Sequence, residues 1–142
     1  MPANAIIEKF IVDQWMMIAI AITSGLMLLW PMLAGLRRGG ALSTLQATQL
    51  INQKDAVIID IRDQAEYARG HILNAKSIPE KVFTERRAEL EKLKSAPIIL
   101  SCDTGQRASA AAQKLRDMGL TDVHVLKGGL NAWREAGLPV TK

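Results

Sequence analysis

This chain of 142 residues contains a run of 23 residues without a charged side chain, from Gln14 to Leu36. At a rise of ~1.5 Å per residue, a helix over this run is about 34 Å long, enough to cross a hydrocarbon layer of about 30 Å. Trp15 and Trp30 lie near its two ends, where amphipathic rings favour the membrane interface. The run therefore predicts one transmembrane helix over residues 14–36.

A cleaved signal peptide and a buried core helix are the alternatives to a retained anchor. A signal peptide has a basic start and a shorter apolar core, whereas Glu8, Lys9 and Asp13 precede this long run. A buried helix of this length with apolar residues on every side is not expected in a domain of this size. We therefore expect the segment to be retained as a membrane anchor.

Basic residues at the ends of the run predict its orientation. Arg37 and Arg38 follow it, and Lys9 is the only basic residue before it. The positive-inside rule then places the C-terminal part in the cytoplasm and residues 1–13 outside it. A single cysteine, Cys102, agrees with a reducing compartment, because it has no partner for an internal disulfide.

After a short glycine-containing linker over 37–43, strand and helix patterns alternate up to residue 142. Apolar runs predict strands, and amphipathic stretches between them predict helices, the first with Thr44 as N-cap and the second with a capping box at Asp63 and Glu66. The strands are expected over 56–60, 75–79, 96–101 and 122–127, and the helices over 44–53, 63–70, 79–94, 105–119 and 129–137. This alternation predicts an α/β fold with a parallel sheet covered by helices on both faces.

The cysteine stands where such sheets gather reactive groups, at the carboxyl end of a strand. Cys102 directly follows the apolar run 96–101, and Gly105 lets the following loop curl. Inward-facing amides of that loop, the start of the next helix and Arg107 all favour a thiolate over a thiol. The pattern predicts a nucleophilic sulfur in a small anion-binding loop, and the alternative is an inert buried cysteine.

Other chemistries find less support in the sequence. A cysteine phosphatase needs an arginine six residues after the cysteine, and Ala108 stands there. We find no metal-ligand pattern, no phosphate-binding glycine loop and no serine-histidine-aspartate arrangement, so no metal or cofactor is expected. The net charge of +4 is spread rather than clustered, and this gives no support to nucleic-acid binding.

Three motifs in order resemble the rhodanese family over about residues 42–138. "IIDIRDQAEYARGHILNA" (58–75) is similar to the family's first signature, "CDTGQR" (102–107) to its active-site loop, and "VLKGGLNAW" (125–133) to its closing signature. The resemblance implies a rhodanese-like domain over 44–142, a three-layer fold around a central parallel sheet of about five strands. The layout with an anchor is similar to single-domain members tethered to bacterial inner membranes.

The resemblance implies a sulfurtransferase in which Cys102 takes sulfur from thiosulfate or a persulfide and passes it to a thiophilic acceptor. The anion-binding loop would be Asp103, Thr104, Gly105, Gln106 and Arg107, with Asp60, Arg62 and His71 as structural support. The expected partners are a small sulfur donor or protein persulfide, the membrane and a membrane protein. A non-catalytic binding or scaffolding module at the membrane is the alternative function.

Two residues depart from the family pattern. Asp103 stands where family loops often carry Arg or Lys, and a carboxylate there opposes a thiolate and repels an anionic donor. Asn74 stands where Gly is common, although Asn tolerates the same turn. The first departure favours a donor less anionic than thiosulfate.

Overall fold

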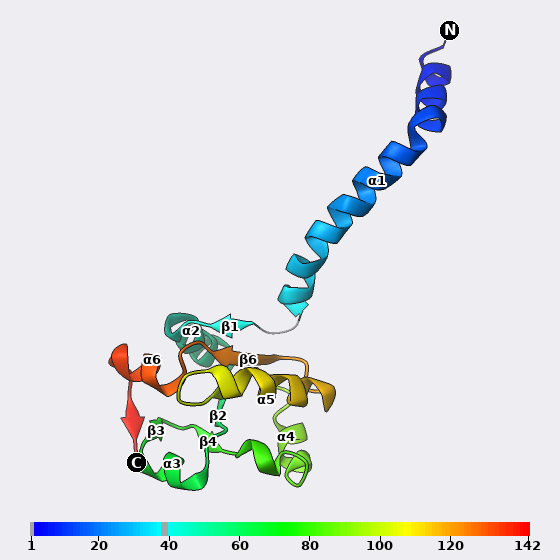
Figure 1. Ribbon diagram of the computed structural model, residues 1–142. Coiled ribbons are helices and arrows are strands. Elements are labelled where there is room, and N and C mark those ends of the chain that lie inside the picture. Colours follow the sequence, from blue (N-terminus) through cyan, green and yellow to red (C-terminus); the bar gives the residue numbers. More distant parts are fainter. Residues whose placement is uncertain (1, 38–39) are drawn as a thin grey trace. The chain divides into compact units, whose positions relative to one another are not determined.

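The computed structural model describes the backbone of residues 2–37 and 40–142 and, within these, every side chain except those of 32–37 (Figure 1). The chain divides into two compact units, with the boundary in the sequence between Leu36 and Arg37. The first is the helix α1 (Ala3–Arg37), and the second holds all other helices and strands. Arg38, on which the predicted orientation partly rests, lies outside the described residues together with residue 39 of the predicted linker.

Helix α1 is one continuous helix of 35 residues. It begins at Ala3, so most of the segment 1–13 is helical as well as the predicted span. The part from Ala3 to Pro31 is long and apolar enough to cross a membrane, although a signal sequence would pass the same test. Its large side chains are exposed, with Trp15 and Trp30 at 64% and 74% of full exposure.

Five parallel strands form the sheet of the second unit, in the order β1-β6-β5-β2-β4. They are β1 (Ala41–Leu42), β2 (Val57–Asp60), β4 (Lys76–Ser77), β5 (Ile98–Ser101) and β6 (Val123–Leu126). The neighbours β2 and β5 are in register from Val57 opposite Ile98 to Asp60 opposite Ser101, so their carboxyl ends lie side by side. The predicted parallel sheet is confirmed.

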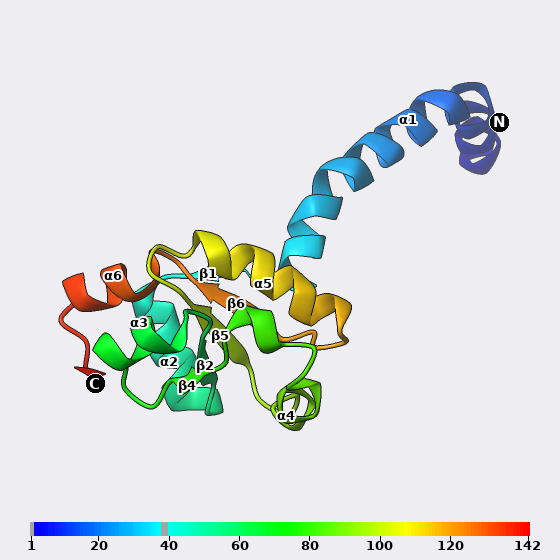
Figure 2. The ribbon, with the colours of Figure 1, turned by 60° about the horizontal axis from the view of Figure 1, so that its bottom comes forward.

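Alternate side chains of the central strands enter two separate cores on the two faces of this sheet, as strand geometry requires. Ile59 and Leu100 join the core beneath α4 (Arg87–Lys92) and α5 (Gln106–Asp117), together with Leu90 and Ala111 from those helices. Ile58 and Ile99 join the opposite core beneath α2 (Thr44–Lys54) and α6 (Gly129–Glu135). Figure 2 shows α5 in front of the sheet. The three-layer architecture is thus confirmed.

The start of the domain differs from the sequence prediction at two points. Ala41 and Leu42 form strand β1 beside β6, so the predicted linker 37–43 includes the first strand of the sheet. The N-cap of α2 is Ser43 rather than Thr44. The Ser43 hydroxyl accepts the Gln46 amide hydrogen, and the Gln46 side chain accepts that of Ser43, which forms a capping box one residue before the predicted N-cap.

The predicted helix over 79–94 is wrong in length. It is divided into a 3-10 turn at Glu80–Val82 and the short helix α4. Arg86 donates to the Ser77 carbonyl at 2.9 Å, which ties the turn between the two pieces to the end of β4. Phe83 in that turn is buried in the same core as Leu90 of α4, and these tertiary contacts override the local helical pattern.

A second, two-stranded sheet was not predicted. Strand β3 (His71–Ile72) pairs antiparallel with β7 (Val140–Thr141), which returns the C-terminus to the helix α3 (Gln64–Arg69) side of the domain (Figure 1). The predicted N-terminus of α3 is confirmed, because Glu66 accepts the Asp63 amide hydrogen at 3.1 Å. The predicted turn at Asn74 is confirmed too, with φ of 63°.

Candidate functional site

Cys102 is the first residue after β5, at the carboxyl end of the sheet, as predicted. Its sulfur accepts the amide hydrogen of Gly105 at 2.9 Å. The residue is 1% exposed and lies at the edge of the core beneath α5. An amide that donates to the sulfur stabilises negative charge on it, whereas burial alone opposes such charge. The loop therefore gives the sulfur one hydrogen bond that favours negative charge, and it shields the sulfur from solvent.

The curl of the loop depends on Gly105, the N-cap of α5, which has φ of 90°. A side chain there would also approach the Leu126 carbonyl oxygen to 3.0 Å. Thr104 and Gln106 on either side are exposed. Of the five predicted loop residues, Gly105 is the one whose contact with the sulfur the described part of the chain shows, and the roles of all five in binding remain a prediction.

The start of α6 holds the cysteine loop from its other side, a contact that sequence reasoning missed. Leu130 donates its amide hydrogen to the Cys102 carbonyl at 2.7 Å, and Asn131 donates to that of Asp103 at 3.2 Å. The approach is so close that a Cβ at Gly129 would lie 2.2 Å from the Cys102 carbonyl oxygen. The Gly-Gly pair in the closing motif was the available signal, because paired glycines mark a close backbone approach.

Asp60 and Arg62 form a buried ion pair at the end of β2. They are 2% and 4% exposed. Arg62 Nη2 lies 2.7 Å from Asp60 Oδ2 and also donates to the Gly70 carbonyl at 2.7 Å, while Nε donates to Asp60 Oδ1 at 3.0 Å. Burial by itself would lower the pKa of the Arg62 guanidinium, but hydrogen bonds and charge from Asp60 and Asp103 outweigh it and raise that pKa. The pair ties β2 to the end of α3.

Asp103 joins the two strand ends through its carboxylate. Oδ1 lies 3.2 Å from Arg62 Nη1, and Oδ2 lies 3.3 Å from Arg107 Nη2. Arg107 is also 3.6 Å from Glu66 Oε1. Two guanidinium groups thus contact the Asp103 carboxylate, and each of them also pairs with a second carboxylate, Arg62 with Asp60 and Arg107 with Glu66.

His71 lies beside this network on strand β3 and is 8% exposed. Its ring stacks on Tyr67 with the centroids 3.6 Å apart. Nδ1 is 2.9 Å from the Tyr67 carbonyl oxygen, which only accepts, so Nδ1 carries the hydrogen. The Tyr67 hydroxyl in turn donates to the Ala75 carbonyl at 2.7 Å. His71 therefore connects β3 to α3, and Tyr67 connects α3 to the turn at Ala75.

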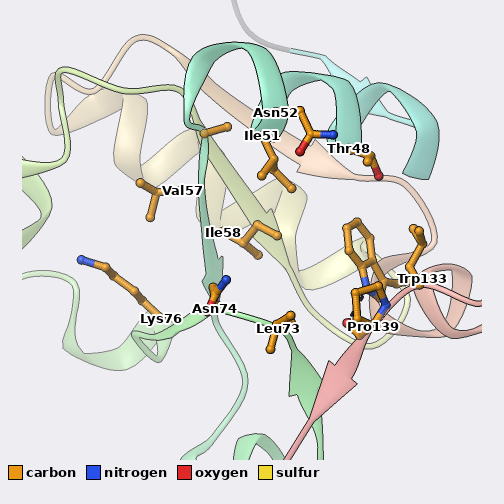
Figure 3. A pocket seen from close by; sticks show the side chains of 12 residues that line it. Thr48, Ile51, Asn52, Val57, Ile58, Leu73, Asn74, Lys76, Trp133 and Pro139 are labelled. Carbon is orange, nitrogen blue, oxygen red and sulfur yellow. Dashed lines mark hydrogen bonds between the residues drawn. The ribbon is translucent and has the colours of Figure 1, made fainter.

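Two cavities of different character flank the second unit. The polar cavity, of about 460 Å³, lies beside the cysteine loop and is lined by Arg62, Glu66, Arg69, Gly70, Asp103 and Arg134. The apolar cavity, of about 380 Å³, lies between α2 and the C-terminal segment, where Ile51, Leu73 and Trp133 face it (Figure 3). Cys102 lines neither, but its neighbour Asp103 lines the polar one. Sequence reasoning missed Arg69 and Arg134, which no motif singles out.

No set of three histidine, cysteine, aspartate or glutamate side chains in the described part of the chain is arranged to hold a metal ion. The arrangement offers instead one sulfur, one amide donor and a network of charged side chains around the loop. Such a site suits nucleophilic chemistry at sulfur.

Comparisons with known proteins agree with the geometry. Residues 43–136 match the family model described as Rhodanese-like domain. The protein YibN of Escherichia coli strain K12 is 34% identical over 98 residues, which cover 68% of each chain. The thiosulfate sulfurtransferase GlpE of Pseudomonas fluorescens is 38% identical over 88 residues, covering 61% of this chain and 77% of GlpE.

A crystal structure of a rhodanese-related protein from Thermoplasma volcanium superposes with a TM-score of 0.63 at 27% identity. It covers 71% of this chain and 96% of that one. The fold, the three motifs and the matched model agree, and the chain belongs to the rhodanese-like family.

Proposed function

We propose that this protein is a sulfurtransferase that carries a persulfide on Cys102. The thiolate attacks the outer sulfur of a donor, the bond between the donor's two sulfurs breaks, and the remainder leaves with the electron pair. With thiosulfate the leaving group is sulfite. With a persulfide R–S–SH it is the thiolate R–S⁻. A thiol acceptor then takes the sulfur by the reverse exchange, and Cys102 returns to its thiolate form.

The Cys102–Gly105 contact carries this proposal. An amide 2.9 Å from the sulfur, in a loop between a parallel strand and a helix N-terminus, stabilises negative charge at that point. The similarity to the GlpE sulfurtransferase supports the same chemistry. Asp103 next to the sulfur favours donors less anionic than thiosulfate, such as a protein persulfide.

We also propose that α1 anchors the domain in the bacterial inner membrane, with the domain in the cytoplasm and a membrane protein among its partners. The length and apolar composition of Ala3–Pro31 support the anchor. We expect the full-length chain to stay with the membrane fraction after an alkaline carbonate wash. Release into the supernatant, or a mature N-terminus beyond the span, would instead show a cleaved signal sequence.

Intact-mass measurement tests the chemical proposal. The purified chain is incubated with thiosulfate and, separately, with a small persulfide, and the mass is read before and after reduction. We expect the gain of one sulfur atom, reversed by reduction and absent in Cys102→Ser. The Ser101→Ala variant, one residue earlier on the same strand, is the matched control and should still load.

The alternative of a non-catalytic binding module at the membrane is favoured by one observation, the 1% exposure of Cys102. If no donor loads sulfur on the folded protein, the catalytic proposal is wrong. Capture of the same membrane partners by the wild type and Cys102→Ser would then support the binding module.

A further inference from the structure

The polar cavity contains two cationic side chains that the rest of the fold does not use. In the described part of the chain, the guanidinium groups of Arg69 and Arg134 make no hydrogen bond and no ion pair, and both residues are exposed. The third arginine of the cavity, Arg62, is committed to Asp60, Gly70 and Asp103. A ligand entering the cavity therefore meets two available guanidinium groups.

The Arg134 guanidinium lies near Gly70, and both residues line this cavity. Its Nη2 would lie 2.8 Å from a Cβ at Gly70, so the guanidinium lies close to the Gly70 backbone. The carbonyl of the same Gly70 accepts from Arg62. Gly70 therefore lies next to both Arg62, which is hydrogen-bonded within the fold, and Arg134, whose guanidinium can bind a ligand.

The charge of the site depends on these two arginines. Without them, the network around the cysteine loop has three carboxylates, Asp60, Glu66 and Asp103, against the guanidinium groups of Arg62 and Arg107. That leaves a net charge of −1, which repels anions. Arg69 and Arg134 change the net charge of these side chains to +1, before any charge on the Cys102 sulfur is counted.

Position and size indicate what kind of anion fits. The cavity, about 460 Å³, adjoins Asp103 but not Cys102 itself, so a group bound between the two arginines is set back from the sulfur. Guanidinium groups bind carboxylates through paired charge-assisted hydrogen bonds. A small thiol with a carboxylate several bonds from its sulfur would place one end in the cavity and the other at Cys102.

From these observations, and resting on the proposed sulfur transfer, we propose that Arg69 and Arg134 bind the carboxylate of a low-molecular-mass thiol that exchanges sulfur with Cys102. In the forward step the thiol R–SH attacks the outer sulfur of the Cys102 persulfide. The S–S bond of the persulfide breaks, Cys102 leaves as a thiolate, and R–S–SH forms. The thiol's proton stays with the released persulfide or goes to solvent, and no external oxidant or reductant is needed.

A matched pair of acceptors tests this. Persulfidated full-length protein in zwitterionic detergent is mixed with N-acetylcysteine or with its neutral amide, and the rate of sulfur loss from Cys102 is followed by intact mass. We expect the preference for the anionic over the neutral thiol to fall about tenfold in R69Q/R134Q, the equivalent of about 1.4 kcal/mol. The control R87Q removes an exposed arginine on α4 and should keep the wild-type preference.

Binding without chemistry separates this proposal from the one it rests on. S-methyl-N-acetylcysteine, which accepts no sulfur, should shift the Gly70 amide resonance of the wild type but not of R69Q/R134Q. If no sulfur loads on Cys102, the sulfurtransferase proposal fails and this titration still decides the cavity. If sulfur loads but the thiol preference and the Gly70 resonance are the same in wild type and variant, the cavity proposal is wrong.

Discussion

The carboxyl ends of β2 and β5 lie side by side, yet the polar groups there are held in opposite ways. At the end of β2, Asp60 and Arg62 satisfy each other and are almost fully buried. At the end of β5, the Cys102 sulfur accepts a single amide hydrogen, that of Gly105, among the contacts of the described residues. In the first arrangement each charged side chain has an oppositely charged partner. In the second, one hydrogen bond from an amide stabilises negative charge on the sulfur.

The comparison separates the strand end that stabilises the fold around the site, that of β2, from the one that holds the candidate nucleophile, that of β5. Removing a member of a closed ion pair exposes its partner to the full cost of burial. Changing a residue around the cysteine loop alters the field and position of one sulfur, with a smaller effect on folding. We therefore expect variants at the end of β2 to change mainly the free energy of unfolding, and variants at the end of β5 to change mainly the reactivity of Cys102.

The largest effect is expected from Arg62→Met. The change leaves the Asp60 carboxylate buried without its cation and the Gly70 carbonyl without its donor. We expect the free energy of unfolding to fall by about 3–5 kcal/mol, measured by urea denaturation of the full chain in detergent. Arg87→Met is the matched control, because its exposed pair with Glu91 contributes no more than about 0.5 kcal/mol. A loss below about 1 kcal/mol for Arg62→Met would contradict the structural role of the pair.

Gly129→Ala should have the next largest effect, and it acts on the β5 end. The new Cβ would meet the Cys102 carbonyl oxygen at 2.2 Å, at a residue with φ of 57°. The start of α6 must move, and the Leu130 amide loses its bond to Cys102. We expect a loss of about 2–3 kcal/mol of stability and slower sulfur loading of Cys102.

Gly137→Ala is the control for Gly129→Ala, because Gly137 also has positive φ, 69°, but open space where its Cβ would lie. Its free energy of unfolding should fall by about 1 kcal/mol, the cost of a left-handed backbone conformation for alanine. Cys102 should load sulfur at the wild-type rate. Equal losses for the two variants would show that the close approach to the cysteine loop does not matter.

The two strand ends also show how far the sequence alone leads. The apolar runs ending at Asp60 and Ser101 predict both strands and place Arg62 and Cys102 at one edge of the sheet. The contact of Asp103 with Arg62 could not be predicted, because Arg62 is 41 residues away and reaches it only through the register of β2 and β5. The same holds for the start of α6, whose contact with Cys102 needs the whole fold.

Local errors have local causes. Ser43 and Thr44 are both good N-caps, and the Gln three residues after Ser43 was the signal that decides between them. Strands β1, β3 and β7 have two residues each, too few for any periodicity. The helical pattern over 79–94 is real, but the burial of Phe83 and the bond from Arg86 to Ser77 interrupt it.

The smallest effect on folding, and the sharpest on chemistry, is expected from Asp103→Asn, since Asp103 joins the two strand ends. Its carboxylate is 43% exposed and its distances to Arg62 and Arg107 exceed 3 Å, so stability should change by less than about 1 kcal/mol. Removing the negative charge on the residue that follows Cys102 lowers the repulsion of a dianion by about 1 kcal/mol. Loading of Cys102 from thiosulfate should therefore rise several-fold, and loading from a neutral persulfide should rise less.

Asp117→Asn, at the far end of α5, removes the same charge away from the cysteine and should leave both loading rates unchanged. Intact-mass time courses with the two donors measure the rates in each variant. If Asp103→Asn slows both donors equally, the carboxylate positions the loop through Arg62 and Arg107 rather than selecting the donor by charge. A rise confined to thiosulfate would instead assign to this one residue the choice between anionic and neutral donors, because the fold around it is unchanged.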